Sequence, residues 1–192
     1  GIRYLNRNRG ALYLVGVALL VFVLGQPYQQ VFVPVLALDV LHVGRSGAGW
    51  MLALTGVGAL LGSLTVATKG HLPRRGLIML GMLMLFSLSL ILLGQSSWLP
   101  LSIAALLLAG SMTTTYMALN NSLLLEGTPP EFHGRVMSLM SLDRGLISIG
   151  AIVAGALAQL VGPQLGLTIM AGACLTLAVL IFIAVPVLRR LD

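Results

Sequence analysis

Two adjacent charged residues, Asp143 and Arg144, lie inside a long apolar stretch of this chain. On a helix their side chains would point about 100° apart, so each would need a partner on another element. A carboxyl group releases its proton less readily when it is desolvated and more readily beside an arginine. A carboxylate that alternates between these surroundings can bind and release a proton, and we hypothesise this role for Asp143. The alternative is a fixed salt bridge that sets helix packing or closes a gate, which is the interpretation favoured for Arg144.

A second polar group consists of Gln26, Gln29 and Gln30, within another apolar stretch. The spacing i, i+3, i+4 places three amides on one face of an α-helix. These amides could bind a polar or mixed ligand. They could equally form hydrogen bonds between helices, at about 0.6 kcal/mol each in a membrane. The sequence favours neither interpretation.

A third polar group lies between Ser111 and Asn121, a run rich in hydroxyl and amide side chains. Serine and threonine hydroxyls can donate to carbonyls of their own helix, so they are weak indicators of a ligand site. Asparagine amides are harder to satisfy in this way. The candidate ligand-binding residues of this run are Tyr116, Asn120 and Asn121. The alternative for the two asparagines is packing at a gate or capping of a helix.

The composition of the chain indicates that these polar residues lie on membrane-spanning helices. Hydrophobic residues make up 58% of the chain and charged residues only 8%, whereas a soluble domain carries about 25% charged residues. A membrane-spanning helix needs roughly 20 mostly apolar residues, and its backbone must satisfy its own hydrogen bonds. We therefore predict an all-α integral membrane protein, with residues 1–10 as the end of a linker and residues 11–192 as one bundle. The six predicted spans are Leu12–Leu38, Gly47–Ala67, Leu77–Leu93, Leu99–Leu125, Val136–Leu160 and Leu167–Leu188.

Basic residues occupy every second gap between these spans. Such residues stay on the cytoplasmic side, so both ends of the chain are predicted to be cytoplasmic in a cell (inner) membrane. The cytoplasmic set is Arg3, Arg7, Arg9, Lys69, Arg74, Arg75, Arg135, Arg189 and Arg190. The gaps Asp39–Ser46, Gln95–Trp98 and Val161–Gly166 then face outward, and only Arg45 lies in them. The net charge of +6 comes from these basic residues. They form no basic face outside the short loops, which argues against a nucleic-acid partner.

The two halves of the chain resemble each other weakly. Gly58 and Gly62 are four residues apart in the second span, as are Gly150 and Ala154 in the fifth, and small residues at this spacing let helices pack closely. The offset of 92 residues (150 minus 58) places span one on span four. A 3+3 inverted repeat of this kind is common in secondary transporters. The alternative is chance recurrence of glycine and alanine.

Enzymatic chemistry has little support in the sequence. The three histidines fall in predicted loops, and no pair of them has the helical spacing of metal ligands. The chain also lacks a phosphate-binding Gly-Lys-Ser/Thr loop, and Cys174 is the only cysteine, buried in the last predicted span. We therefore expect no enzyme activity, no metal and no cofactor.

The stretch from Asn120 to Leu139 (NNSLLLEGTPPEFHGRVMSL) resembles the junction of helices ten and eleven in the major facilitator superfamily. The likeness is to the branch of macrolide efflux proteins and the enterobactin exporter, with Gly134 and Arg135 in the cytoplasmic loop motif. His133 stands where that branch usually has arginine, and the glutamine of its pattern is absent. The stretch from Lys69 to Gly76 resembles the loop between helices eight and nine of that branch. The resemblance extends over essentially the whole chain.

The resemblance implies that the chain is the C-terminal six-helix half of a twelve-helix carrier, with spans one and four lining the central cavity. It implies secondary active, proton-coupled export, by antiport, of amphipathic small molecules of drug, macrolide or siderophore type. The implied partners are the lipid bilayer, the substrate, protons, and a missing N-terminal half or a second copy. The alternative is a stand-alone six-helix channel or structural subunit that acts as an oligomer. The substrate itself is not identified by any residue.

Overall fold

The computed structural model describes residues 9–68, 74–140 and 143–185, and each regular element in them is a helix. Side chains are described for these residues except 9–11, 135–136, 139–140 and 143–144. After the first segment, the helices are α4 (Gly44–Thr68), α5 (Arg75–Gln95), α6 (Leu99–Glu126), η3 (Pro130–Phe132), α7 (His133–Met140), α8 (Asp143–Val161) and α9 (Pro163–Ala184).

The first membrane segment is an interrupted helix. It begins as α2 (Arg9–Leu24) and continues through η1 (Tyr28–Phe32), α3 (Val33–Val35) and η2 (Leu36–Val40), in which η1 and η2 are π-helical turns. The Val21 carbonyl accepts hydrogen bonds from the N–H groups of both Gly25 (2.8 Å) and Gln26 (3.0 Å), so the helix widens there. Pro27 cannot donate a backbone hydrogen bond, which explains why the regular ladder stops at this point.

Five helical segments of the described residues are long and apolar enough to span a membrane, namely Leu12–Val40, Gly44–Thr68, Arg75–Gln95, Leu99–Glu126 and Pro163–Ala184. A sixth apolar helix, Gly145–Val161, is shorter. The sequence predicted one continuous span over Val136–Leu160. The structure describes α7 and α8 in this range, on either side of residues 141–142, which lie outside the description, so the continuity of the span stays a prediction.

The gap predicted at Val161–Gly166 is much shorter in the structure. Only Gly162 separates α8 from α9. Gly162 has φ +87°, a conformation that a residue without Cβ adopts readily, and Pro163 supplies a favourable first helical residue. The other gaps are also shorter than predicted. Polar residues such as Arg75, Gln95 and Glu126 belong to the helix ends rather than to the loops.

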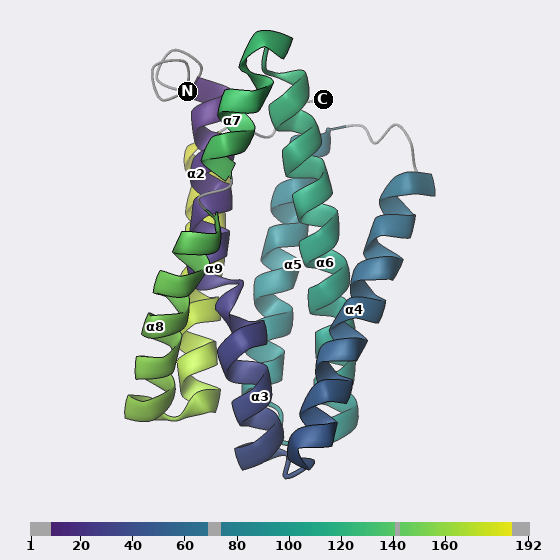
Figure 1. Ribbon diagram of the computed structural model, residues 1–192, viewed down its shortest axis with the longest axis vertical. Helices are drawn as coiled ribbons and strands as arrows, with labels where there is room; N and C mark the ends of the chain where they lie inside the picture. The colour runs from purple at the N-terminus through teal and green to yellow at the C-terminus, as the bar shows by residue number, and fades with distance from the viewer. Residues whose placement is uncertain (1–8, 69–73, 141–142, 186–192) are drawn as a thin grey trace.

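The helices form an elongated bundle in which successive long segments run in opposite directions (Figure 1). α2 begins and α9 ends at the same end, which we call the terminal end (Figure 1). α6 packs between α4 and α5, α5 packs on α9, α9 on α8, and α8 on α2. The core between them is apolar, with Leu80, Leu90, Leu106 and Leu124 fully buried.

Two contacts in this bundle are made by glycines that abut backbone. A Cβ at Gly58 or Gly62 of α4 would overlap the carbonyl groups of Leu107 or Ser111 of α6. A Cβ at Gly150 of α8 would overlap the Val23 carbonyl of α2. Both small-residue pairs singled out in the sequence therefore lie at close helix contacts, as the spacing predicted, with Ala154 also fully buried.

Candidate functional site

The interruption of the first segment carries the predicted glutamines. Gln26 lies in the turn after α2, whereas Gln29 and Gln30 lie in the π-helical turn η1. Gln26 and Gln29 are half-buried and Gln30 is exposed. The prediction of one shared face assumed α-helical spacing. The wider π turn changes the angle between successive side chains, so that assumption does not hold here.

Aromatic packing holds this interruption against α5. Tyr28 is buried and meets Phe86 edge to face, with 5.8 Å between the ring centroids. Gln29 donates from Nε2 to the Tyr28 hydroxyl at 3.0 Å. A Cβ at Gly25 would come within 2.7 Å of Phe86 Cε1, so the glycine lets the chain approach the ring. The position of the Gln29 amide is therefore set by the core rather than by a loose loop.

The inner face of α6 carries buried polar atoms that have no hydrogen-bond partner in the described part of the chain. They are Thr113 Oγ1, Tyr116 Oη and Asn120 Oδ1. The three residues are at i, i+3 and i+7, so they share one helix face, and each is at most 7% exposed. Buried polar atoms nearly always have a partner, from protein, water or ligand. The stripe is therefore a candidate site for hydrogen bonds to water or to a ligand.

Sequence reasoning found two members of this stripe but not Thr113, because a threonine hydroxyl usually bonds to its own helix. Thr115 does so, donating to the Ser111 carbonyl at 2.9 Å. The spacing of Thr113 from Tyr116 and Asn120 is the signal that could have identified it. Asn121 lies on the exposed side of α6, away from the stripe.

The two asparagines of α6 lie at a different depth from the glutamines. Asn120 and Asn121 are in the last two turns of α6, close to the terminal end, where α6 ends. The glutamines come after the whole length of α2, which begins at that end (Figure 1). A ligand that reaches both the asparagines and the glutamines would have to extend along the bundle.

Asp143 and Arg144 open α8, and their side chains lie outside the described part. Both α7 and α8 contact α2, so these two helices lie alongside the bundle (Figure 1). Gly134, in the first turn of α7, is exposed, and the side chain of Arg135 is not described.

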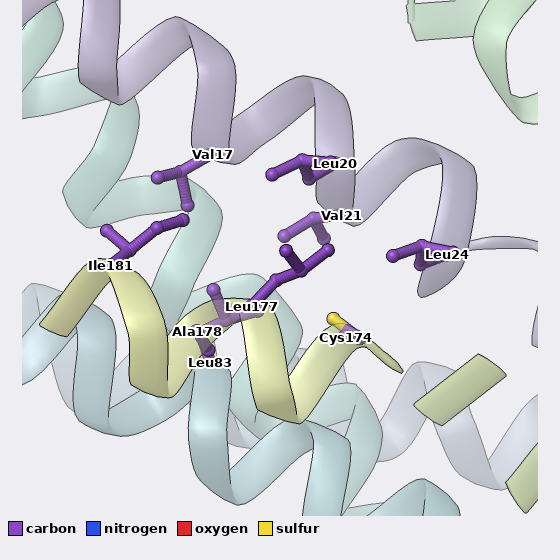
Figure 2. Close-up of a pocket in the computed structure, with 9 residues that line it drawn as sticks. All are labelled: Val17, Leu20, Val21, Leu24, Leu83, Cys174, Leu177, Ala178 and Ile181. Carbon is purple, nitrogen blue, oxygen red and sulfur yellow. The ribbon is translucent and has the colours of Figure 1, made fainter. Parts of the chain in front are cut away.

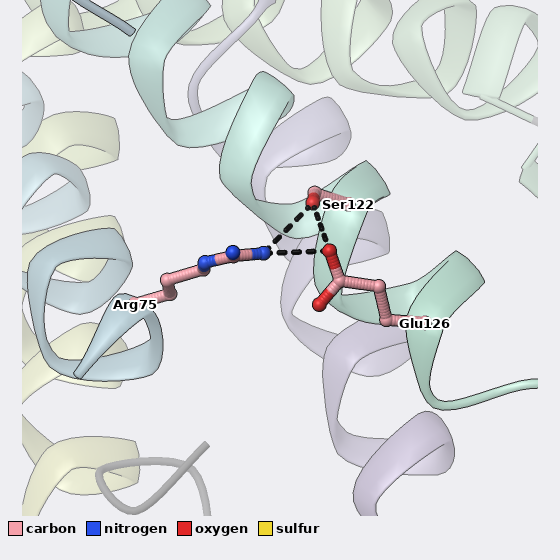
Figure 3. Close-up of polar contacts among 3 residues, drawn as sticks. All are labelled: Arg75, Ser122 and Glu126. Atoms are coloured by element: carbon pink, nitrogen blue, oxygen red, sulfur yellow. Dashed lines mark hydrogen bonds and ion pairs between the residues drawn. The ribbon is translucent and has the colours of Figure 1, made fainter. Parts of the chain in front are cut away.

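The terminal end of α6 is tied to two neighbouring elements. Arg75 of α5 binds Glu126 (2.6 Å) and the Ser122 hydroxyl (3.3 Å) through one nitrogen, and Ser122 donates to Glu126 at 3.0 Å (Figure 3). His133 was expected in a loop, but it begins α7. Its Nε2 lies 2.7 Å from the Thr128 carbonyl and 3.0 Å from that of Leu125, so the ring contacts the backbone at the C-terminal end of α6 and just beyond it.

A small pocket between α2, α5 and α9 offers no chemistry. Its volume is about 10 Å³, and its lining is apolar apart from the Cys174 thiol, with side chains such as Val21, Leu83 and Ile181 around it (Figure 2). Such a space barely holds one water and offers it few polar partners. Across the described residues, no group of three or more His, Cys, Asp or Glu side chains could hold a metal ion.

Comparison with known proteins agrees with the bundle and its long apolar helices. No curated protein and no solved structure matches the chain. A family model described as the Major Facilitator Superfamily matches residues 9–191. This match extends over nearly the whole chain, and the chain therefore belongs to the major facilitator superfamily of membrane transporters.

Proposed function

We propose that this chain is one bundle of a secondary active transporter that exports amphipathic small molecules, of drug, macrolide or siderophore type, in exchange for protons. The observation that carries the proposal is the interrupted first segment, with Gln26, Gln29 and Gln30 at the interruption. Substrate sites of secondary transporters are commonly built at discontinuous helices near the middle of the membrane. Export and substrate type rest on the resemblance of the Asn120–Leu139 stretch to efflux proteins.

The substrate would contact two groups of residues. Gln26, Gln29 and Gln30 would hydrogen-bond its polar parts in one half of the membrane. The second group is Tyr116, Asn120 and Asn121 of α6, to which we add Thr113. Thr113, Tyr116 and Asn120 support this assignment, because each has a buried polar atom with no hydrogen-bond partner among the described residues. An elongated molecule with separated polar groups fits this arrangement better than a small ion.

Transport of a fluorescent amphipathic dye by everted membrane vesicles tests the site. We expect Gln29→Ala to raise KM for the dye several-fold, because an amide held by Tyr28 is lost. Gln159→Ala is the matched control, since Gln159 is an exposed amide near the end of α8. Equal kinetics for wild type, Gln29→Ala and Gln26→Ala would overturn the substrate assignment.

Asp143 is proposed to carry the exchanged proton, and Arg144 to hold a fixed ion pair. The supporting observation is that α8, which Asp143 opens, contacts α2, as does α7. Asp143→Asn should abolish dye-dependent proton movement while the dye still binds. Proton-driven transport that survives Asp143→Asn would contradict the coupling role, and the dye-binding measurement separates lost coupling from misfolding.

We further propose that a complete carrier pairs this bundle with a second one, in a cell membrane and with both ends of this chain cytoplasmic. The two glycine contacts, α4 on α6 and α8 on α2, support a 3+3 inverted repeat. An antibody against the last residues should detect a native protein near twice the 20.2 kDa of this chain. A native band at 20.2 kDa would instead favour the alternative, an oligomeric six-helix channel or structural subunit.

A further inference from the structure

The two tryptophans of the chain, Trp50 and Trp98, lie at one end of the bundle. Trp50 is in the second turn of α4, and Trp98 is the residue that precedes α6. Both helices begin at the end of the bundle opposite the terminal end (Figure 1). The side chains are 70% and 67% exposed, so neither indole belongs to the core.

The lengths of α4 and α6 place both indoles near the boundary of the hydrocarbon. The 25 and 28 residues of these helices correspond to about 38 Å and 42 Å, whereas a hydrocarbon core is about 30 Å thick. Both helices therefore extend past the hydrocarbon into the headgroup layer. Trp50 lies roughly 9 Å from the first residue of α4, and Trp98 lies just outside α6. Both positions fall where the upper acyl chains meet the headgroups.

The exposed side chains change from polar to apolar around these positions. Arg45 precedes Trp50 in α4, and Gln95 precedes Trp98 at the end of α5, and both polar side chains are exposed. Deeper in α4 the exposed side chain is apolar, as at Leu60, which is 70% exposed. An indole has a large apolar ring and one N–H donor, so it suits a layer that is apolar on one side and polar on the other.

A set of hydrogen bonds between two buried serines fixes the backbone of Trp98. The Trp98 N–H donates to Ser96 Oγ at 3.2 Å, and Ser96 Oγ donates to the Trp98 carbonyl at 3.0 Å. Ser102 Oγ donates to Ser96 Oγ at 3.1 Å, and the Ser102 N–H donates to the Trp98 carbonyl at 3.1 Å. Ser96 and Ser102 are 4% and 0% exposed, so solvent does not compete for these bonds. The exposed indole therefore extends from a backbone that is held in place.

We propose that Trp98 is a fixed anchor in the lipid headgroup layer of the leaflet opposite the terminal end, that Trp50 is a second anchor in the same leaflet, and that Ser102 is a positioning residue for Trp98. The partner is the lipid itself. The apolar part of each indole packs on the upper acyl chains, and its N–H donates to an ester or phosphate oxygen. This contact requires no net charge on the headgroup, and it does not depend on the exported substrate.

Fluorescence quenching in phosphatidylcholine vesicles tests the depth of each indole in the full native protein. Trp50→Phe leaves Trp98 as the fluorophore within this chain, and Trp98→Phe leaves Trp50. We expect lipids brominated near the headgroup end of the acyl chain to quench each indole several-fold more than lipids brominated near the methyl end. Leu60→Trp, in a background without both native tryptophans, is the control, because Leu60 is exposed near the middle of α4. It should show the opposite order of quenching.

Fluorescence anisotropy tests the role of Ser102. With Trp98 as the fluorophore, Ser102→Ala should lower the anisotropy, because the bonds that hold the Trp98 backbone are weakened. Ser87→Ala is the matched control, since Ser87 is an equally buried serine whose hydroxyl donates to the Leu83 carbonyl of its own helix at 3.0 Å. It should leave the anisotropy of Trp98 unchanged. Ser96→Ala removes the same set of bonds and is the second variant if Ser102→Ala does not fold.

Stronger quenching of Trp98 by the lipid brominated near the methyl end would overturn the anchor, because the indole would then lie within the hydrocarbon. Quenching by aqueous iodide but by neither lipid would overturn it too, since the indole would lie in water. Absence of quenching by iodide and by both lipids would mean that protein covers Trp98, which also contradicts the proposal. An anisotropy of Trp98 that is unchanged in both Ser102→Ala and Ser96→Ala would overturn the positioning role of Ser102.

Discussion

The Val23 carbonyl of α2 lies directly against Gly150 of α8. Pro27, four residues after Val23, has no N–H to donate to this carbonyl, and the Tyr28 N–H donates to Gly25 instead (3.4 Å). A glycine Cα–H can approach such an oxygen and form a weak hydrogen bond. The interruption of the first segment and the glycine of α8 are thus one arrangement, since the glycine shields the carbonyl that the proline leaves free.

Replacement of Gly150 by alanine should disrupt this arrangement. The added methyl group would overlap the Val23 carbonyl and come within 2.7 Å of Pro27 Cγ, and backbone cannot yield as a flexible side chain can. We expect a loss of about 1–3 kcal/mol in the free energy of unfolding, measured by titration with denaturing detergent. Gly155→Ala is the control on the same helix, because its Cβ meets nothing within 4 Å. It should stabilise α8 by up to about 1 kcal/mol. Equal effects of both variants would contradict the packing argument.

The contact between α4 and α6 should respond in the same way. A Cβ at Gly62 would overlap the Ser111 carbonyl, and one at Gly110 would overlap that of Thr55. Each alanine variant should lower the unfolding free energy by about 1–3 kcal/mol. Gly56→Ala, with open space around its Cβ, should not. The melting temperature of the purified protein in one detergent would rank the three variants, and a lower value for Gly56→Ala than for Gly62→Ala would refute the prediction.

The stripe on α6 predicts that removal of the Tyr116 hydroxyl does not lower the free energy of unfolding. Its hydroxyl is buried and has no partner in the described part of the chain, so Tyr116→Phe removes a desolvation cost of about 1–3 kcal/mol. The variant should be at least as stable as wild type. Thr115→Val, which removes a hydroxyl that donates to the Ser111 carbonyl, should cost about 0.5–1.5 kcal/mol instead. Destabilisation by Tyr116→Phe would mean that water or a ligand already pairs with the hydroxyl.

The ion pair of Arg75 and Glu126 should contribute little to stability. The two side chains are 19% and 53% exposed, and ion pairs of this exposure contribute about 0.2–1 kcal/mol. Glu126→Gln should therefore lower the unfolding free energy by less than about 1 kcal/mol at low salt, and by less at high salt. The charge-reversed double variant Arg75→Glu, Glu126→Arg should regain most of the unfolding free energy that each of its two single variants loses. Failure of this recovery in the double-mutant cycle would show that Ser122, rather than the charge, sets the contact.

Hydrophobic run length predicted most of the helices, because a membrane requires long apolar segments with internally satisfied backbones. It could not predict the exact ends. Arg75, Gln95 and Glu126 remain helical, since the energetic cost of a polar side chain ends at the headgroups whereas helical hydrogen bonding continues. Run length also could not predict the π-helical turns at Tyr28–Phe32 and Leu36–Val40. Proline predicts a disturbance but not its geometry.

The sequence predicted which residue types belong to the candidate site, but it did not predict which of those residues share a face. Helical spacing placed Gln26 with Gln29 and Gln30 on one face, but the turn and the π-helix change the angle between successive side chains, and Gln30 is exposed whereas the other two are half-buried. Asn120 and Asn121 are adjacent in sequence, yet one is buried and the other exposed, because neighbours on a helix face different surroundings. The contacts of α6 with α4, α5 and α2 decide which of its faces is interior.

The single residue that joins α8 to α9 has a mechanical consequence. With only Gly162 between them, and with α9 packed on α8, the two helices have no slack with which to separate at that end. A displacement of α8 therefore also displaces α9, and the two helices move as one rigid pair. The connection at Gly162 also leaves almost no loop between the two helices. A protease site or epitope inserted there would separate α8 from α9.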